Sequence, residues 1–174
     1  SGIATLTRKY VSALTPGSTT RIADTRKTTP GLRAFERYAV RCGGAHNHRD
    51  NLGSAVMIKD NHLAVLDGDI AKAVALAREA SPELKIEVEA DTAEQARAAA
   101  EAGADIVLLD NMSCEQIREA IELIDGRSET EASGGVTLET VREIAGTGVN
   151  FISVGALTHS APSVDIALDF DQIA

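Results

Sequence analysis

The sequence predicts an α/β fold in which parallel strands and helices alternate around a barrel. Short apolar runs alternate with amphipathic stretches of about ten residues, the pattern of consecutive βα units. The residues expected at five successive strand ends, Lys59, Glu89, Asp110, Ser133 and Gly155, stand 30, 21, 23 and 22 residues apart. In a barrel all strand ends meet on one face, where such enzymes place their active sites, whereas in an open sheet only the ends beside a switch point meet. Because every expected strand ends in a polar residue or glycine, the barrel is favoured.

The first elements are a helix, a strand and a second helix. Ile3, Leu6 and Tyr10 recur at helical spacing and predict a helix over 3–14. A strand over 20–24 runs into the sequence DTRKTTPGLR, whose Thr-Thr-Pro-Gly turn precedes the next helix. The remaining elements of this half are a helix over 31–42, a polar loop GGAHNHRDN over 43–51 and a strand over 55–59.

The second half repeats the alternation of helix and strand without a linker or a change of composition. We therefore expect one domain over residues 1–174. In order, the expected elements are helix 69–80, strand 86–89, helix 92–102, strand 105–109, helix 114–125, strand 130–133, helix 137–146, strand 151–155 and a last segment around 165–170.

Composition excludes several classes of protein. Lys and Arg total 17 against 26 Asp and Glu, so the surface as a whole does not fit nucleic acid, and any basic site is local. No run approaches the roughly 18 apolar residues of a membrane span. Cys42 and Cys114 form no cysteine-pair motif and no signal peptide is present, which indicates a reduced cytoplasm with both thiols buried and free. Because the chain starts at Ser1 and enters a helix almost at once, we expect a fragment of a longer or processed protein.

Five bases are expected on the same face of the barrel. Arg26 and Lys27 follow the first strand, His48 and Arg49 precede the second, and Lys59 ends it. Arg26 and Lys27 alone would fit a solvated loop pair, but a lysine at the end of a buried strand is costly without a partner or ligand. Several cations in one cleft, two of them guanidinium groups, suit a compact polyanion with carboxylates or phosphates.

Two acidic residues are the counterpart of these bases. Glu89 and Asp110 stand at neighbouring strand ends, and Glu87 lies on the same side of its strand as Glu89. We interpret Glu87 as a satisfied structural carboxylate. Glu89 and Asp110 have the residue types to bind Mg²⁺, accept hydrogen bonds from sugar hydroxyls, stabilise a developing positive charge or act as acids in glycoside cleavage.

Two glycine loops follow the last two full strands. Ser133-Gly134-Gly135 and Val154-Gly155-Ala156 allow backbone N–H groups to approach an anion, and barrels often bind phosphate near their last strands. His159 fits a contact to that phosphate and fits an ordinary surface histidine equally well.

A series of sequence motifs runs along the chain in the order DTRKTTPGLR, NHR, IKDNH, EVEAD, LLDN, SGG and SVGALTH. Together these motifs closely resemble quinolinate phosphoribosyltransferase, also called nicotinate-nucleotide pyrophosphorylase (carboxylating). The resemblance covers nearly the whole chain. It implies an incomplete barrel of six to seven strands that follows an N-terminal α/β sandwich domain. It also implies Mg²⁺-dependent transfer of phosphoribosyl from phosphoribosyl pyrophosphate to quinolinate with decarboxylation, which yields nicotinate mononucleotide, pyrophosphate and CO₂ on the route to NAD.

The resemblance assigns a role to each matching position. The pocket for the quinolinate carboxylates and the pyrophosphate would comprise Thr25, Arg26, Lys27, His48, Arg49 and Lys59. Glu89 and Asp110 would face the ribose hydroxyls and Mg²⁺, and Lys59, Glu89 and Asp110 would serve catalysis. The 5′-phosphate cradle would comprise Ser133, Gly134, Gly135, Ser153, Val154, Gly155 and His159.

The chain departs from the family pattern in two respects. Asp50 and Ser54 stand where the family usually has an apolar residue and an aspartate, and Asp50 would place a negative charge beside Arg49. The resemblance also implies an N-terminal domain upstream of Ser1, which this sequence lacks. In the family, an arginine of that domain completes the pocket of the neighbouring subunit. The intact parent is expected to be a cytoplasmic homodimer or larger oligomer, and the fragment alone to catalyse poorly.

Three other functions remain open at this point. A paralogous pyrophosphorylase-like protein encoded with molybdenum transporters shares the barrel and much of the motif set. A Schiff-base aldolase would use Lys59, a position where such a lysine fits, although the paired bases of DTRK argue against it. A bare barrel that binds phosphate without catalysis is the third.

Overall fold

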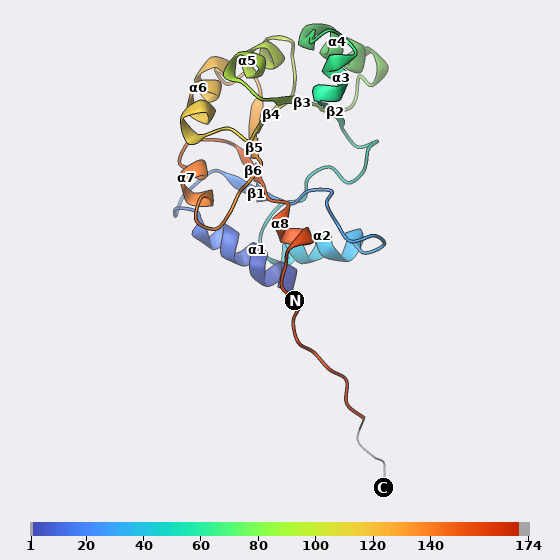
Figure 1. Ribbon diagram of the computed structural model, residues 1–174, viewed down its shortest axis with the longest axis vertical. Coiled ribbons are helices and arrows are strands. Elements are labelled where there is room, and N and C mark those ends of the chain that lie inside the picture. Colours follow the sequence, from blue (N-terminus) through green and yellow to red (C-terminus); the bar gives the residue numbers. More distant parts are fainter. Residues whose placement is uncertain (1, 171–174) are drawn as a thin grey trace.

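Six parallel strands form one curved sheet in the computed structural model, which describes residues 2–170 (Figure 1). The spatial order is β1-β6-β5-β4-β3-β2, and each neighbouring pair is parallel. The strands are β1 (Arg21–Ala23), β2 (Val56–Ile58), β3 (Ile86–Ala90), β4 (Ile106–Asp110), β5 (Glu129–Ser133) and β6 (Phe151–Ser153). The predicted parallel α/β fold is therefore confirmed.

The helices lie around the outside of this sheet (Figure 1). They are α1 (Gly2–Ala13), α2 (Arg33–Cys42), α3 (Asp60–Ala64), α4 (Ile70–Ala80), α5 (Ala93–Glu101), α6 (Cys114–Ile124), α7 (Val141–Ala145) and α8 (Ala156–His159). Side-chain oxygens begin several of them: Asp69, Thr92 and Ser113 each accept a hydrogen bond from a backbone N–H of the first turn.

The barrel is incomplete at one seam. The segment that contains His46 pairs with β1 through a single parallel bridge, in which His46 N donates to Ile22 O at 2.8 Å and Asp24 N donates to His46 O at 3.0 Å. This segment occupies the place of a seventh strand beside β1, although it forms only one bridge there. Within residues 2–170, no strand pairing joins it to β2 at the other edge. The count therefore agrees with the expected six to seven strands.

The core lies between the sheet and the helices. Ile86 and Val88 of β3 are fully buried, while Glu87 and Glu89 alternate with them and face the inside of the barrel. Helix α5 packs on β3 and β4 through small side chains such as Ala96, which is fully buried and allows a close approach. Burying a Val or Ile side chain contributes about 1.5–3 kcal/mol, so this layer stabilises the strands whose ends carry the site.

Several local predictions differ from the structure. The short α3 was not expected; it begins where Lys59 N donates to His62 Nδ1 at 3.0 Å. The helix expected over 137–146 is reduced to α7, because Thr137 and Thr140 form a hydrogen-bonded turn before it. Residues 161–170 form no helix or strand, so the last segment predicted around 165–170 is not a regular element.

The prediction that both thiols are buried is wrong. Cys42 is exposed and Cys114 is partly exposed, although both are free. Cys42 follows the fully buried Val40 by two residues, about 200° around the helix, and therefore lies away from the core. None of the helices in the described part of the chain combines the length and apolar character needed to cross a membrane.

Candidate active site

A cavity of about 690 Å³ opens at the carboxyl ends of the strands. Every site residue predicted from the sequence lines it: Thr25, Arg26, Lys27, His48, Arg49, Lys59, Glu89, Asp110, Ser133, Gly134, Gly135, Ser153, Val154, Gly155 and His159. The sequence reasoning did not single out Met57, Leu108, Asn111, Glu131, Val136 or Thr137, which line the same cavity, as does Ala156 of the second glycine loop. The roles of the predicted residues stay predictions, but the fold brings all of them together.

The loop after β1 is fixed so that its two bases face the cavity. Arg33 holds this loop from α2: its Nε donates to Thr28 Oγ1 at 2.9 Å and its Nη2 donates to Arg26 O at 3.2 Å. From α8, Thr158 Oγ1 donates to Lys27 O at 2.6 Å. Within residues 2–170, Arg26 Nε is buried and has no hydrogen-bond partner, so this donor is available to an anion.

Asp24 positions the second group of bases. Its fully buried carboxylate accepts hydrogen bonds from His48 N at 2.7 Å and Asn47 Nδ2 at 2.6 Å, and it lies 3.7 Å from Arg37 Nη1. Burial raises the pKa of Asp24 above its ordinary value, against the hydrogen bonds and charges that favour the carboxylate. Arg37 also donates to His48 O at 2.9 Å and Arg49 O at 3.2 Å, so the backbone of both residues is held.

Arg49 spans the open seam of the barrel. Its Nη1 donates to Ala55 O at 3.1 Å and its Nη2 contacts Met57 Sδ at 3.3 Å, both at the β2 edge. Burial and the nearby Arg26 charge lower the pKa of Arg49, while Glu87 raises it. The guanidinium thus links the two unpaired edges of the barrel and lines the cavity between them.

The two positions that depart from the family pattern lie outside this cavity. Asp50 is largely exposed, with its Oδ1 3.4 Å from Arg37 Nε. Ser54 Oγ donates to Asn51 O at 3.0 Å within the loop before β2. The expectation of a negative charge beside Arg49 in the pocket therefore does not hold, because Asp50 pairs with Arg37 instead.

The acidic residues lie between the bases and the glycine loops. Lys59 Nζ and Glu89 Oε2 form an ion pair across the ends of β2 and β3. On the next strand, Asp110 Oδ2 accepts a hydrogen bond from Asn111 Nδ2 at 2.6 Å. An incoming carboxylate would compete with Glu89 for Lys59, and a sugar hydroxyl or a cation would compete with Lys59 for Glu89.

The glycine loops form a further wall of the cavity, which adjoins Lys27. Gly134 and Gly135 have φ of +90° and +59°, which L side chains rarely adopt. A Cβ at Gly155 would lie 3.0 Å from His159 Nε2 and 3.4 Å from Lys27 Cδ. His159 therefore lies against the loop, beside a lysine, which is a better setting for an anion than an ordinary surface position.

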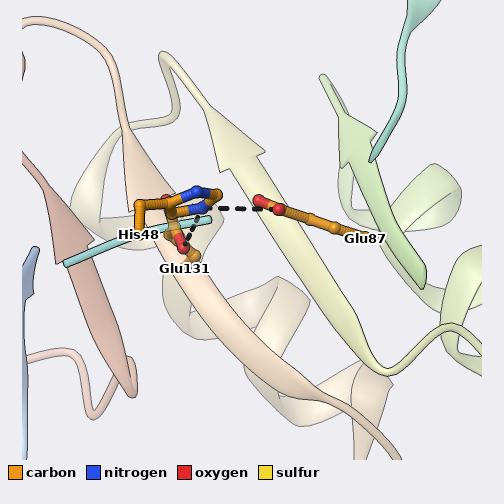
Figure 2. A group of neighbouring side chains, drawn as sticks. All are labelled: His48, Glu87 and Glu131. Atoms are coloured by element: carbon orange, nitrogen blue, oxygen red, sulfur yellow. Dashed lines mark ion pairs between the residues drawn. The ribbon is translucent and has the colours of Figure 1, made fainter. Parts of the chain in front are cut away.

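A cluster of three ionisable side chains lies inside the barrel beneath these groups. His48 Nε2 is 3.2 Å from Glu131 Oε2 and 3.3 Å from Glu87 Oε2, and both glutamates are buried (Figure 2). Burial lowers the pKa of His48, but the hydrogen bonds and charges of Glu131 and Glu87 raise it to about 10. Burial raises the pKa of Glu87, and the neighbouring Glu131 charge adds to this, against the hydrogen bond from His48.

The interpretation of Glu87 as a satisfied carboxylate holds for only one of its oxygens. In the described part of the chain, Glu87 Oε1 and Glu131 Oε1 are buried without hydrogen-bond partners. Glu131 lies on β5 between Thr130 and Ala132, as Glu87 lies on β3 between Ile86 and Val88. Because side chains alternate between the two faces of a strand, this pattern could have placed Glu131 inside the barrel from the sequence. The three ligand atoms lie close enough to hold a metal ion, but the ring proton shared by two carboxylates would have to leave first, so we interpret the group as an ion cluster.

Comparisons with known proteins agree with this arrangement. Residues 3–169 match the family model described as quinolinate phosphoribosyl transferase, C-terminal domain. The chain is 51% identical over 170 residues to the probable nicotinate-nucleotide pyrophosphorylase [carboxylating] of Bacillus subtilis and 44% identical over 173 residues to the nicotinate-nucleotide pyrophosphorylase [carboxylating] of Homo sapiens. In both comparisons the match covers 97% of this chain and 58% of the relative, so the chain spans less than two thirds of their length.

Solved structures show the same likeness. The crystal structure of NadC from Streptococcus pyogenes superposes with a TM-score of 0.90 at 50% identity, over 95% of this chain and 57% of that one. The nicotinate-nucleotide pyrophosphorylase from Ehrlichia chaffeensis superposes with a TM-score of 0.91 at 43% identity, over 97% of this chain and 61% of that one.

Proposed function

The chain belongs to the quinolinate phosphoribosyl transferase C-terminal domain family, and from that premise we propose the reaction that its cavity serves. The protein that contains this chain transfers phosphoribosyl from phosphoribosyl pyrophosphate to quinolinate with decarboxylation, and forms nicotinate mononucleotide, pyrophosphate and CO₂ for NAD biosynthesis. The observation that carries the proposal is one cavity in which five bases, two carboxylates and two glycine loops line different walls.

The basic wall binds the quinolinate dicarboxylate and the pyrophosphate. Arg26, Lys27, Arg49 and Lys59 gather in a chain whose net charge is −9, so this wall is a local exception to the charge of the molecule. The buried, unpartnered Nε of Arg26 supports an anion at this wall. Guanidinium groups bind carboxylates in a bidentate manner, which orients a planar diacid as well as attracting it. Thr25 supports the loop, because its Oγ1 accepts a hydrogen bond from Lys27 N at 3.2 Å.

The acidic wall faces the ribose. We assign Glu89 and Asp110 to the ribose hydroxyls and to Mg²⁺, which prefers carboxylate oxygens and commonly takes one or two of them together with substrate phosphates. Both carboxylates line the same cavity, and their oxygen donors fit this ion. When bound, Mg²⁺ would neutralise charge on the pyrophosphate leaving group. The carboxylates themselves stabilise the positive charge that develops on the ribose as its bond to pyrophosphate breaks.

The glycine wall binds the 5′-phosphate. Backbone N–H groups near Ser133, Gly134 and Gly135, together with those near Ser153, Val154 and Gly155, approach an anion closely because glycine lacks a Cβ. His159 and Lys27 lie beside Gly155 and add charge and hydrogen-bond donors. With the sugar held between this wall and the basic wall, the quinolinate nitrogen faces the anomeric carbon, and positioning supplies much of the rate.

We further propose that the chain is the barrel domain of a longer two-domain protein that works as a cytoplasmic homodimer. The share of the relatives' length that the chain leaves uncovered supports the longer protein. The two free cysteines fit a reducing compartment. An arginine from the neighbouring subunit would complete the basic wall, so the isolated chain should bind substrates weakly.

The alternatives have less support. Lys59 is ion-paired with Glu89, and a protonated amine is a poor nucleophile, which disfavours the Schiff-base aldolase. The molybdenum-transport-linked paralogue and the non-catalytic phosphate-binding barrel predict no release of CO₂ from quinolinate, so turnover separates them from the proposed enzyme.

The deciding measurement is CO₂ release from carboxyl-labelled quinolinate with phosphoribosyl pyrophosphate and Mg²⁺. It should be made on residues 1–174 and on a chain extended upstream to the length of its relatives. Turnover by the extended chain supports the proposal. Binding of phosphoribosyl pyrophosphate without turnover in either protein would contradict it and favour the paralogue or the bare barrel.

A further inference from the structure

We propose that Glu87 and Glu131 are positioning residues that hold the His48 imidazole as a fixed cation at the base of the dicarboxylate pocket. This inference rests on the proposed function for the identity of the ligand. It assigns a role to the two carboxylates that the reaction itself does not use.

The geometry directs both carboxylates to one ring nitrogen. Glu131 Oε2 and Glu87 Oε2 lie 3.2 Å and 3.3 Å from His48 Nε2, and they reach it from β5 and β3 (Figure 2). The Nε2 proton is thus committed to the glutamates. The Nδ1–H is the remaining ring donor for a substrate carboxylate in the cavity that His48 lines.

The cluster separates two cavities inside the barrel. His48 and Glu131 line the substrate cavity, and together with Glu87 they also line a second cavity of about 280 Å³ beneath it. The imidazole is therefore part of the base of the upper cavity, supported by carboxylates at the level of the lower one.

Fold stability does not account for this arrangement. Glu87 and Glu131 are 1% and 2% exposed, and burying charges costs more than an apolar core of similar volume. The loop does not need the imidazole as an anchor either, because Asp24 and Arg37 already hold the backbone of His48. A costly cluster that leaves one oxygen of each glutamate unpartnered among the described residues points to a role in binding.

The charges around His48 are consistent with that role. Arg26 and Arg49 repel one another in the same cavity, and the Glu87 carboxylate offsets that repulsion at Arg49. Asp24 faces His48 from the end of β1 and adds a further negative charge. Glu87 therefore favours the Arg49 cation, and Glu87 and Glu131 together favour the His48 cation, before a dicarboxylate arrives, so less reorganisation is needed on binding.

The test compares Glu131→Gln with Glu129→Gln in the upstream-extended chain. Glu129 lies two residues earlier on β5 and pairs with Lys85 at 3.1 Å on a more exposed part of the strand, so it is a matched control. In free protein with ¹⁵N-labelled histidine, the His48 signals, assigned with His48→Asn, should be those of an imidazolium at about pH 8, above the ordinary histidine pKa. Glu131→Gln should lower the His48 pKa by about 1–3, and Glu129→Gln should leave it unchanged.

The kinetic readout separates positioning from general damage. Glu131→Gln should raise the KM for quinolinate about tenfold, the equivalent of one lost charged contact, and leave the KM for phosphoribosyl pyrophosphate within about twofold. Adding Glu131→Gln to a His48→Asn background should have little further effect, because it acts through the imidazole. A neutral His48 at that pH in the parent, or equal kinetics for the two glutamine variants, overturns the inference.

The outcomes also distinguish failure of the inference from failure of the proposed function. A parent protein without turnover refutes the reaction, and with it the assignment of the ligand. A neutral imidazole in a parent that turns over quinolinate refutes only the role of the two glutamates.

Discussion

Replacing Gly134 by alanine tests how the glycine loop and the ribose carboxylate depend on one another. Gly134 has φ +90°, and a Cβ built there would overlap Asn111 Oδ1 and lie 2.6 Å from Asn111 Cγ and 3.0 Å from Asn111 N. Asn111 cannot yield freely, because its N donates to Ser133 O at 2.9 Å and its Nδ2 donates to Asp110 Oδ2 at 2.6 Å. The next residue, Gly135, has φ +59° and open space around its Cβ position, so Gly135→Ala is the matched control.

The expected free-energy difference follows from these two environments. Both alanines enter a left-handed backbone conformation, at a cost of about 1–2 kcal/mol. Gly134→Ala also forces a side chain into an occupied site, and overpacking of this kind costs typically about 1–3 kcal/mol more. We therefore expect Gly134→Ala to lower the free energy of unfolding by about 2–5 kcal/mol and Gly135→Ala by about 1–2 kcal/mol.

Urea unfolding followed by circular dichroism measures that difference, and kinetics measure its effect on the site. Displacing Asn111 moves the donor to Asp110, so Gly134→Ala should raise the KM for phosphoribosyl pyrophosphate more than Gly135→Ala does. Equal unfolding free energies for the two variants would refute the reasoning, because they would show that Asn111 moves aside without cost.

Three further predictions concern the bases and the carboxylates that hold them. Lys59→Ala should raise the KM for quinolinate about 10- to 100-fold, since a hydrogen bond to a charged group contributes about 1.5–3 kcal/mol, while Lys72→Ala on the exposed face of α4 should not. Asp24→Ala removes the carboxylate that accepts from the buried His48 N and leaves Asp50 as the remaining carboxylate beside Arg37 among the described residues, so it should cost about 1–3 kcal/mol of stability. Asp50→Ala, which removes the exposed carboxylate beside the same arginine, should cost at most about 0.5 kcal/mol. The pKa of His48 is raised in the folded protein to about 10, so its stabilisation is fully present below the unfolded value of about 6.5 and is lost as pH rises through about 10. His48→Gln should therefore flatten the decline of the urea midpoint over that pH window, and an unchanged decline would contradict the shifted pKa.

The strands and their polar ends could be predicted from the sequence because each depends on local information. A buried parallel strand is a short apolar run, and Asp110 or Lys59 at its end is recognisable from the change to a polar residue. Once the strands are known to be parallel, their ends must share a face, so gathering the site needed no contact information. The register itself, such as Asp110 opposite Ser133, came only from the structure.

The interior of the barrel was harder to predict, because it depends on pairs distant in the sequence. Glu131 stands 83 residues after His48, and nothing local indicates that the two meet. Asp24 could be placed at a strand end, but its role in fixing the His48 backbone arises from a bridge of a single residue pair, which has no periodic signal. The exposure of Cys42 was missed because general burial statistics ignore which face of a helix a residue occupies.

At the open seam of the barrel, a long side chain of the cationic wall bridges the gap that strand pairing leaves. Between the His46 segment and β2 no backbone ladder is formed in residues 2–170, so the two edges at this seam are not held in register by strand pairing. Arg49 bridges the gap with contacts to Ala55 O and Met57 Sδ, and its guanidinium lines the cavity at the same time. Lysine has one donor group where arginine has a planar fork, so it could not make both contacts and still face a carboxylate. Closure of the barrel and binding of the diacid therefore depend on the same guanidinium, and substrate binding should stiffen the seam.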